Sequence, residues 1–242
     1  MKARNKLILG RVMNMKKLSI LVVFVFIAAL AACSAEPDVL YSEPVIPEIK
    51  FSYRHGQELI FIDAAELVER AGHVFIGEVE RIYFAVINDV TGRAPTKECN
   101  PRFLTLVTIY DVNVLTSYKG AQQSIMRVMT SGGIKGYRES EQLAIIMEAG
   151  AVSNDGEYRI LINLDITPLE VGRAYLFTLR DLIVELDGYS NFVGLVSSYH
   201  SFLDLNDPFE TVVYFSNISV ESIISEFGET AFEEFLQIYN NP

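Results

Sequence analysis

Strand-like patterning dominates residues 73–205 of this chain and most constrains its fold. Residues 73–87 are rich in β-branched and aromatic residues and carry no helix cap. Residues 104–115 follow the same pattern, and there Tyr110, Val112 and Val114 alternate with polar residues, as in a strand with one solvated face. Further strands are indicated at 125–130, 169–179 and 192–205. At least five strands therefore predict a mainly β core.

Helical signals are confined to the two flanks of this core. Asp63, followed three residues later by Glu66, predicts a capped short helix over 64–71. Apolar residues at helical spacing predict two short helices within 219–238, separated by Gly228. Residues 134–156 show no consistent strand or helix pattern. We expect this segment to leave the sheet and to contain a helical turn. Gly77 interrupts the first strand and predicts a bulge or a close approach.

The N-terminal region carries a targeting signal. An apolar run over 18–32 follows Lys16 and Lys17 and ends in small residues before Cys33. The sequence Leu-Ala-Ala-Cys at 30–33 resembles the lipobox of bacterial lipoproteins, which implies a signal peptide over 1–32 and lipidation of Cys33, with a diacylglycerol thioether and palmitate. Fifteen residues are too few to span a bilayer comfortably, although an uncleaved anchor helix is the alternative. Met13 and Met15 are alternative starts of translation.

The region after Cys33 is typical of a spacer. Residues 33–50 contain several acids and prolines, including Pro37 and Pro44, and show no helical period. Proline keeps such a segment extended, so we expect a tether that holds the domain away from the bilayer. The resulting organisation is a signal peptide over 1–32, a tether over 33–50 and a single globular, mainly β domain over 51–242. We therefore expect a cell membrane protein, lipid-anchored on the extracytoplasmic face.

Charge narrows the choice of partners. The chain carries 20 basic and 31 acidic residues, and the segment before Cys33 holds six of the basic ones and no acid. Removal of that segment changes the net charge from 20 − 31 = −11 to 14 − 31 = −17. Such a polyanion gains nothing from counterion release on nucleic acid, so we expect no nucleic-acid partner. An unknown extracytoplasmic protein or envelope ligand remains as the partner.

The cysteines fit this location. If Cys33 carries lipid, Cys99 has no partner for a disulfide. Cys99 lies in a polar segment without a nearby histidine or second cysteine, so we interpret it as a spare surface or half-buried residue. A reactive thiol is the alternative interpretation.

No catalytic, metal or cofactor motif stands out. The three histidines, His55, His73 and His200, lack metal-ligand spacing, and residues 132–136 have the glycines of a phosphate loop but not its Gly-Lys-Ser/Thr ending. We interpret the glycines as a flexible turn. The oxygen-rich segment 204–210 lacks the EF-hand spacing and indicates a solvated turn rather than a calcium loop. Asn217 matches a glycosylation acceptor, but we assign its region to the cap of the following helix.

Three segments together resemble a known domain family. They are a hydrophobic strand with an internal glycine (74–79), an alternating strand ending in Tyr-Lys-Gly (112–120) and a turn leading into an apolar strand (171–177). Their succession resembles tissue-inhibitor-of-metalloproteinase and netrin-like domains, which implies an OB-type barrel over roughly residues 63–205. In that family a free N-terminal cysteine binds the protease zinc, whereas Cys33 here is expected to be acylated, and the family's disulfides are missing.

The expected fold class is thus mainly β (α+β): a small OB-like barrel with one short helix before it and two short helices after it. The expected function is that of a membrane-anchored lipoprotein with a non-enzymatic binding domain and no cofactor. One alternative is a hydrolase of envelope polymers that uses scattered carboxylates, drawn from a set of five (Glu139, Glu141, Glu148, Asp155 and Glu157). Another is an inhibitor of an extracellular protease, which the family resemblance suggests.

Overall fold

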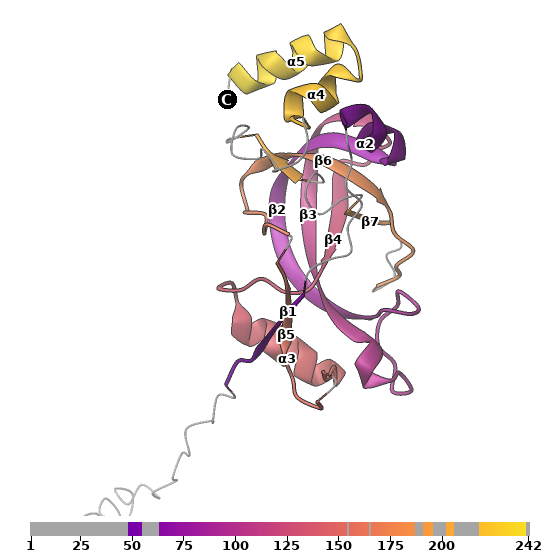
Figure 1. The fold of residues 1–242 in the computed structure, drawn as a ribbon, viewed down its shortest axis with the longest axis vertical. Coiled ribbons are helices and arrows are strands. Elements are labelled where there is room, and N and C mark those ends of the chain that lie inside the picture. Colours follow the sequence, from indigo (N-terminus) through magenta and orange to yellow (C-terminus); the bar gives the residue numbers. More distant parts are fainter. Residues whose placement is uncertain are drawn as a thin grey trace, which may run out of the picture. The chain divides into compact units, whose positions relative to one another are not determined.

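Figure 1 shows the computed structural model of the chain, which describes residues 48–54, 63–153, 155–164, 166–186, 191–195, 202–205 and 218–240. Residues 48–242 cluster as one compact unit. The predictions for residues 1–47, which include the signal peptide, Cys33 and most of the tether, lie outside the described residues. In chain order, the elements are β1 (Phe51–Arg54), α2 (Ala64–Arg70), β2 (His73–Asn88), a 3₁₀ turn (Pro101–Phe103), β3 (Leu104–Lys119), β4 (Ile125–Ser131), α3 (Glu139–Ala149), β5 (Ile160–Asn163), β6 (Ala174–Asp181), β7 (Phe192–Leu195), β8 (Phe202–Asp204), α4 (Val220–Ser225) and α5 (Glu229–Asn240).

The main sheet is a closed barrel, as predicted. Its strands run in the order β2-β3-β4-β7-β6, and β6 pairs back onto β2. All these pairings are antiparallel except that of β4 with β7, which is parallel. The short strand β8 extends the β7 side of the barrel along β6. A small barrel with α3 inserted between β4 and β6 is the OB-like architecture expected from the sequence.

Gly77 lies in the part of β2 that pairs with both β3 and β6. The register of β2 against β3 shifts between Ile76 and Gly77, which confirms the predicted irregularity. A Cβ atom on Gly77 would lie 2.5 Å from Cγ1 of Val112 and 3.0 Å from the carbonyl oxygen of Asn113. Only glycine therefore allows β3 to approach β2 this closely, and the approach lets β2 curve from β3 toward β6.

Alternate residues of the strands fill the barrel. Phe75 of β2 stacks on Phe177 of β6 with ring centroids 4.9 Å apart, and both side chains are fully buried. Tyr110 of β3 is buried in the same core, and burial raises the pKa of its phenol to about 12. The opposite faces of β2, β3 and β4 carry a second apolar cluster, which includes Ile109 and Phe192. Both faces of these strands are thus partly covered, and Asp111, which we expected on a solvated face of β3, is buried.

The capped helices form where the sequence places them. The carboxylate of Asp63 accepts a hydrogen bond from the amide of Glu66 at 2.9 Å and begins α2. Ser219 and Ser222 form a reciprocal capping box at the start of α4. Together with α5, these helices bury an apolar cluster that includes Leu67, Ile223 and Phe235 against β2 and β6. In Figure 1, α4 and α5 lie beyond α2 at one end of the barrel.

A second, smaller layer was not predicted. The four-residue strands β1 and β5 pair in parallel, and β5 is also bridged to Gly133 at the end of β4. The predicted helical turn within 134–156 is a full helix, α3, of 11 residues. β1, β5 and α3 lie together at the barrel end away from α4 and α5 (Figure 1).

Gln142 fixes the connection from β4 to α3. Its side chain is fully buried; Oε1 accepts from the amide of Ile134 at 3.0 Å, and Nε2 donates to the carbonyl oxygens of Ile134 and Tyr137. Gly133 makes room for this amide, since a Cβ atom there would lie 1.9 Å from Oε1 of Gln142. This connection places α3 against the barrel and so shapes the pocket between α3 and the small layer.

Candidate functional site

The pocket with the strongest claim to function lies where the small layer meets the barrel. It has a volume of about 570 Å³ and opens between β1, β5, the start of β3 and the C-terminal end of α3. Its lining comprises Ser52, Arg54, Arg102, Leu104, Thr105, Leu106, Ile146, Ala151, Val152, Ser153, Asp155, Arg159 and Leu161. A volume of this size is typical of small-molecule sites.

Charge at the pocket opposes that of the chain as a whole. Arg54, Arg102 and Arg159 contribute three guanidinium groups, whereas Asp155 is the single acid of the lining. The lining therefore carries 3 − 1 = +2 in a strongly acidic protein. The lining also contains apolar side chains, of which Leu104, Val152 and Leu161 are partly exposed. The pocket can thus take a ligand that combines negative charge with an apolar part.

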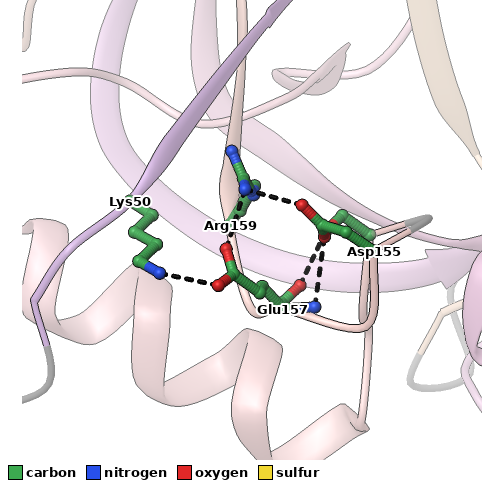
Figure 2. Close-up of polar contacts among 5 residues, drawn as sticks. Lys50, Asp155, Glu157 and Arg159 are labelled. Atoms are coloured by element: carbon green, nitrogen blue, oxygen red, sulfur yellow. Dashed lines mark hydrogen bonds and ion pairs between the residues drawn. The ribbon is translucent and has the colours of Figure 1, made fainter.

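Arg159 is held in place by two carboxylates (Figure 2). Its Nη2 lies 2.6 Å from Oδ2 of Asp155 and 2.7 Å from Oε2 of Glu157. Glu157 in turn pairs with Lys50, whose Nζ lies 2.7 Å from Oε1. This chain of ion pairs connects the residue that precedes β1 with the residue that precedes β5. It orients the guanidinium and links both strands at the pocket rim.

A tight turn positions the carboxylates. The hydroxyl of Ser153 donates a hydrogen bond to Asp155, and the amide of Glu157 donates to Oδ1 of Asp155 at 3.2 Å. The Ser153 hydrogen bond is the main cause that lowers the pKa of Asp155. The pKa of Glu157 is lowered chiefly by the hydrogen bond from Lys50. Both groups are therefore ionised at neutral pH, which suits them for orienting Arg159 and not for donating a proton.

The other two guanidinium groups are free of carboxylates within the described part of the chain. Arg54 donates to the hydroxyl of Ser131, and Arg102 makes no ion pair with any described residue. Nε of Arg159 is buried and has no acceptor among the described residues. Because guanidinium groups stay charged and present several donors in one plane, this arrangement suits oxyanions.

The carboxylates singled out from the sequence do not meet at one centre. Of the five, the structure brings together Asp155 and Glu157, both on Arg159. Glu139 accepts a hydrogen bond from the amide of Gly136 within its own helix start, and Glu141 pairs with Arg138. Glycoside hydrolysis needs one carboxyl with a raised pKa, whereas the pKa values of Asp155 and Glu157 are both lowered.

The glycine-rich segment is a turn, and it is closely packed. The amides of Gly132 and Gly133 donate to the carbonyl oxygens of Leu106 and Leu161, both at 2.8 Å. These amides are used internally and cannot cradle a phosphate, which agrees with the interpretation of this segment as a turn. Its packing against β3 and β5 differs from the flexible turn that we expected.

Several other residues singled out from the sequence lie away from the pocket or outside the described residues. His55, His200, Asn217 and most of the segment 204–210 are outside the described residues. His73 is mostly buried and its Nε2 lies 2.8 Å from Oδ1 of Asp181. Among the described residues, no three His, Cys, Asp or Glu side chains gather in a way that could hold a metal ion. No helix within the described ranges is long and apolar enough to cross a membrane.

Cys99 is a free, partly exposed thiol, as expected. Its sulfur receives hydrogen bonds at 3.3 Å from the amide of Thr96 and from the side-chain amide of Asn88. Hydrogen bonds from Thr96 are the main cause that lowers the pKa of the thiol. Cys99 is absent from the pocket lining, so the structure connects it to no other candidate residue.

The three arginines of the pocket were not predicted from the sequence. Each comes from a different part of the chain: the end of β1, the turn before β3, and the residue before β5. No motif connects them, and only the pairing of β1 with β5 brings Arg54 and Arg159 to one opening. The one feature of the sequence that could have drawn attention to these arginines is the small number of basic residues, since residues 33–242 contain only 14.

Comparison with known proteins adds no assignment: no protein-family model matches the chain, and no curated protein shows significant sequence similarity.

Proposed function

We propose that this chain is a membrane-anchored extracytoplasmic lipoprotein whose OB-like domain is a binding module for an anion-bearing ligand. The observation that carries the proposal is the pocket with three arginines and one carboxylate in an otherwise acidic chain. The ligand, free or borne by an envelope protein, presents its anionic group to this opening.

The anchor half of the proposal rests on the sequence. The lipobox at Cys33 supplies acyl chains, and two or more chains hold a protein stably at a bilayer. Expression of the full chain in a bacterium with labelled palmitate tests this half. Label is expected in the wild type and absent from Cys33→Ala, while Cys99→Ala serves as the matched control and keeps its label. Label that persists in Cys33→Ala contradicts the anchor.

The binding half is supported by the way in which the pocket is built. Ion pairs orient Arg159 before any ligand arrives, which reduces the ordering cost of binding. Arg54 and Arg102 are exposed and without carboxylate partners among the described residues, so a ligand need not displace an existing ion pair. The ionised carboxylates favour binding over the hydrolase alternative, while the protease-inhibitor alternative stays a prediction.

The pocket is tested with the full chain, purified in a neutral detergent and immobilised. Bacterial envelope components are passed over it and eluted with salt. We expect at least one anionic component that wild type retains and the double variant Arg54→Gln, Arg102→Gln loses. The control is Arg93→Gln, which removes one surface guanidinium paired with Glu185, outside the pocket lining. Identical retention by all three proteins contradicts the proposed function.

A further inference from the structure

The three pocket arginines are not equivalent in charge. Arg159 already contacts two ionised carboxylates, so its charge is compensated by the protein itself. Arg54 contacts a neutral hydroxyl and Arg102 makes no ion pair with a described residue. Two positive charges at the opening are therefore left for a ligand to neutralise.

The rest of the protein sets an upper limit on ligand charge. Residues 48–242 contain 14 basic and 28 acidic residues, a net charge of 14 − 28 = −14. A long polyanion would extend beyond the pocket and meet this negative field, which is unfavourable. A ligand with one negative charge, by contrast, would leave one of the two guanidinium groups uncompensated. Charge matching thus favours a compact ligand with two negative charges.

The pocket wall indicates what carries those charges. Leu104, Val152 and Leu161 of the lining are only half-buried, so they expose apolar surface at the pocket. An apolar surface of this kind gains free energy when an apolar group covers it. The volume of about 570 Å³ limits that group to the size of a small molecule or one residue of a larger one.

From these features we infer that the ligand of this pocket is a compact dianion on a small apolar body, bound by Arg54 and Arg102 across the opening. This inference rests on the proposed function and specifies its ligand. Two sources offer the same chemistry: a phosphate monoester, with a charge of about −1.5 to −2 at pH 7, and a dicarboxylate.

Two matched pairs of probes test the inference on the full chain in neutral detergent by isothermal titration calorimetry at about pH 7.5, where a phosphate monoester is mostly dianionic. Phenyl phosphate and phenyl sulfate share shape and apolar body and differ by one charge. Isophthalate and benzoate are the corresponding carboxylates: they share the benzene ring and differ by one carboxylate group. We expect at least one dianion to bind roughly tenfold or more tightly than its monoanionic partner, since a hydrogen bond to a charged group contributes a factor of this order. The preferred pair identifies the source.

Single-residue variants test whether Arg54 and Arg102 cause the preference for dianions over monoanions. Arg54→Gln and Arg102→Gln each remove one exposed guanidinium and are expected to reduce the dianion preference to about twofold or less. Arg93→Gln, a surface control, is expected to retain it. A preference that survives both pocket variants overturns the inference, as does equal affinity within both pairs of probes.

The outcomes separate this inference from the proposed function. If monoanions and dianions bind equally and the pocket variants weaken both, the pocket is an anion site but the dianion inference is wrong. If no probe binds while retention of an envelope component still depends on Arg54 and Arg102, the dianion inference again fails alone. If retention is also independent of these arginines, both fail.

Discussion

Replacement of Gln142 by leucine tests how the pocket wall is held. The side chain is fully buried and satisfies three backbone groups: the amide of Ile134 and the carbonyl oxygens of Ile134 and Tyr137. Leucine has a similar size but no polar atom, so all three groups lose their partner. A buried polar group left unsatisfied costs about 1–3 kcal/mol. With the lowest value for each group, Gln142→Leu should lower the free energy of unfolding by about 3 kcal/mol.

Urea denaturation followed by circular dichroism measures this loss, and thermal unfolding provides a second measurement. For a domain of this size, 1 kcal/mol corresponds to roughly 2–4 °C, so the midpoint should fall by roughly 6–12 °C. Glu148→Gln, at an exposed position of the same helix, is the control and should change stability by less than about 0.5 kcal/mol. A loss below about 1 kcal/mol for Gln142→Leu would refute the reasoning, because the three backbone groups would then have found other partners.

Three further predictions address other parts of the unit. Gly77→Ala should destabilise the barrel by about 1–3 kcal/mol in urea denaturation, because its Cβ atom would overlap a valine of β3; Gly72→Ala, where the nearest atom lies at 3.7 Å, is the control and should cost less. The lowered pKa of Asp155 implies a stabilising contribution that is present above the unfolded-state value near 4 and is lost as the pH falls through the folded value. Asp155→Asn should therefore flatten the pH dependence of the urea midpoint between about pH 5 and 2, and an unchanged profile would contradict this assignment. The thiol of Cys99 should react with iodoacetamide faster at about pH 7 than a free cysteine, and Thr96→Val should slow it; equal rates would show that the hydrogen bonds do not lower its pKa.

Much of the barrel could be predicted because its signals are local. β2 and β3 each run for 16 residues and are rich in β-branched and aromatic residues. Strands of this length contain enough residues for the β pattern to be recognised in the sequence. Asp63 and Ser219 indicate helix starts through side chains that act within three residues. The bulge at Gly77 was also visible, because glycine has no side chain to pack in a strand and so marks a bulge or a close backbone approach.

The small layer could not be predicted because its signals are distant and brief. β1 and β5 have four residues each, and their register pairs Phe51 with Ile160 across most of the domain. α3 has little hydrophobic asymmetry between its faces, since a glutamine rather than an apolar residue fills one of its buried positions. The candidate site depends on this layer, so its arginines could not be connected from the sequence, whereas the acids of 139–157 lie close together along the chain.

β1 also has a mechanical consequence. It is the first strand after the segment 1–47, and Ser52 and Arg54 of β1 form part of the pocket wall. Any pull transmitted through the N-terminal segment reaches the domain through β1, where the short ladder to β5 and the ion pair between Lys50 and Glu157 resist it. Ile49 and Phe51 also pack against the barrel core. Tension on the N-terminal segment would therefore act first on β1 and on the part of the pocket wall that β1 forms.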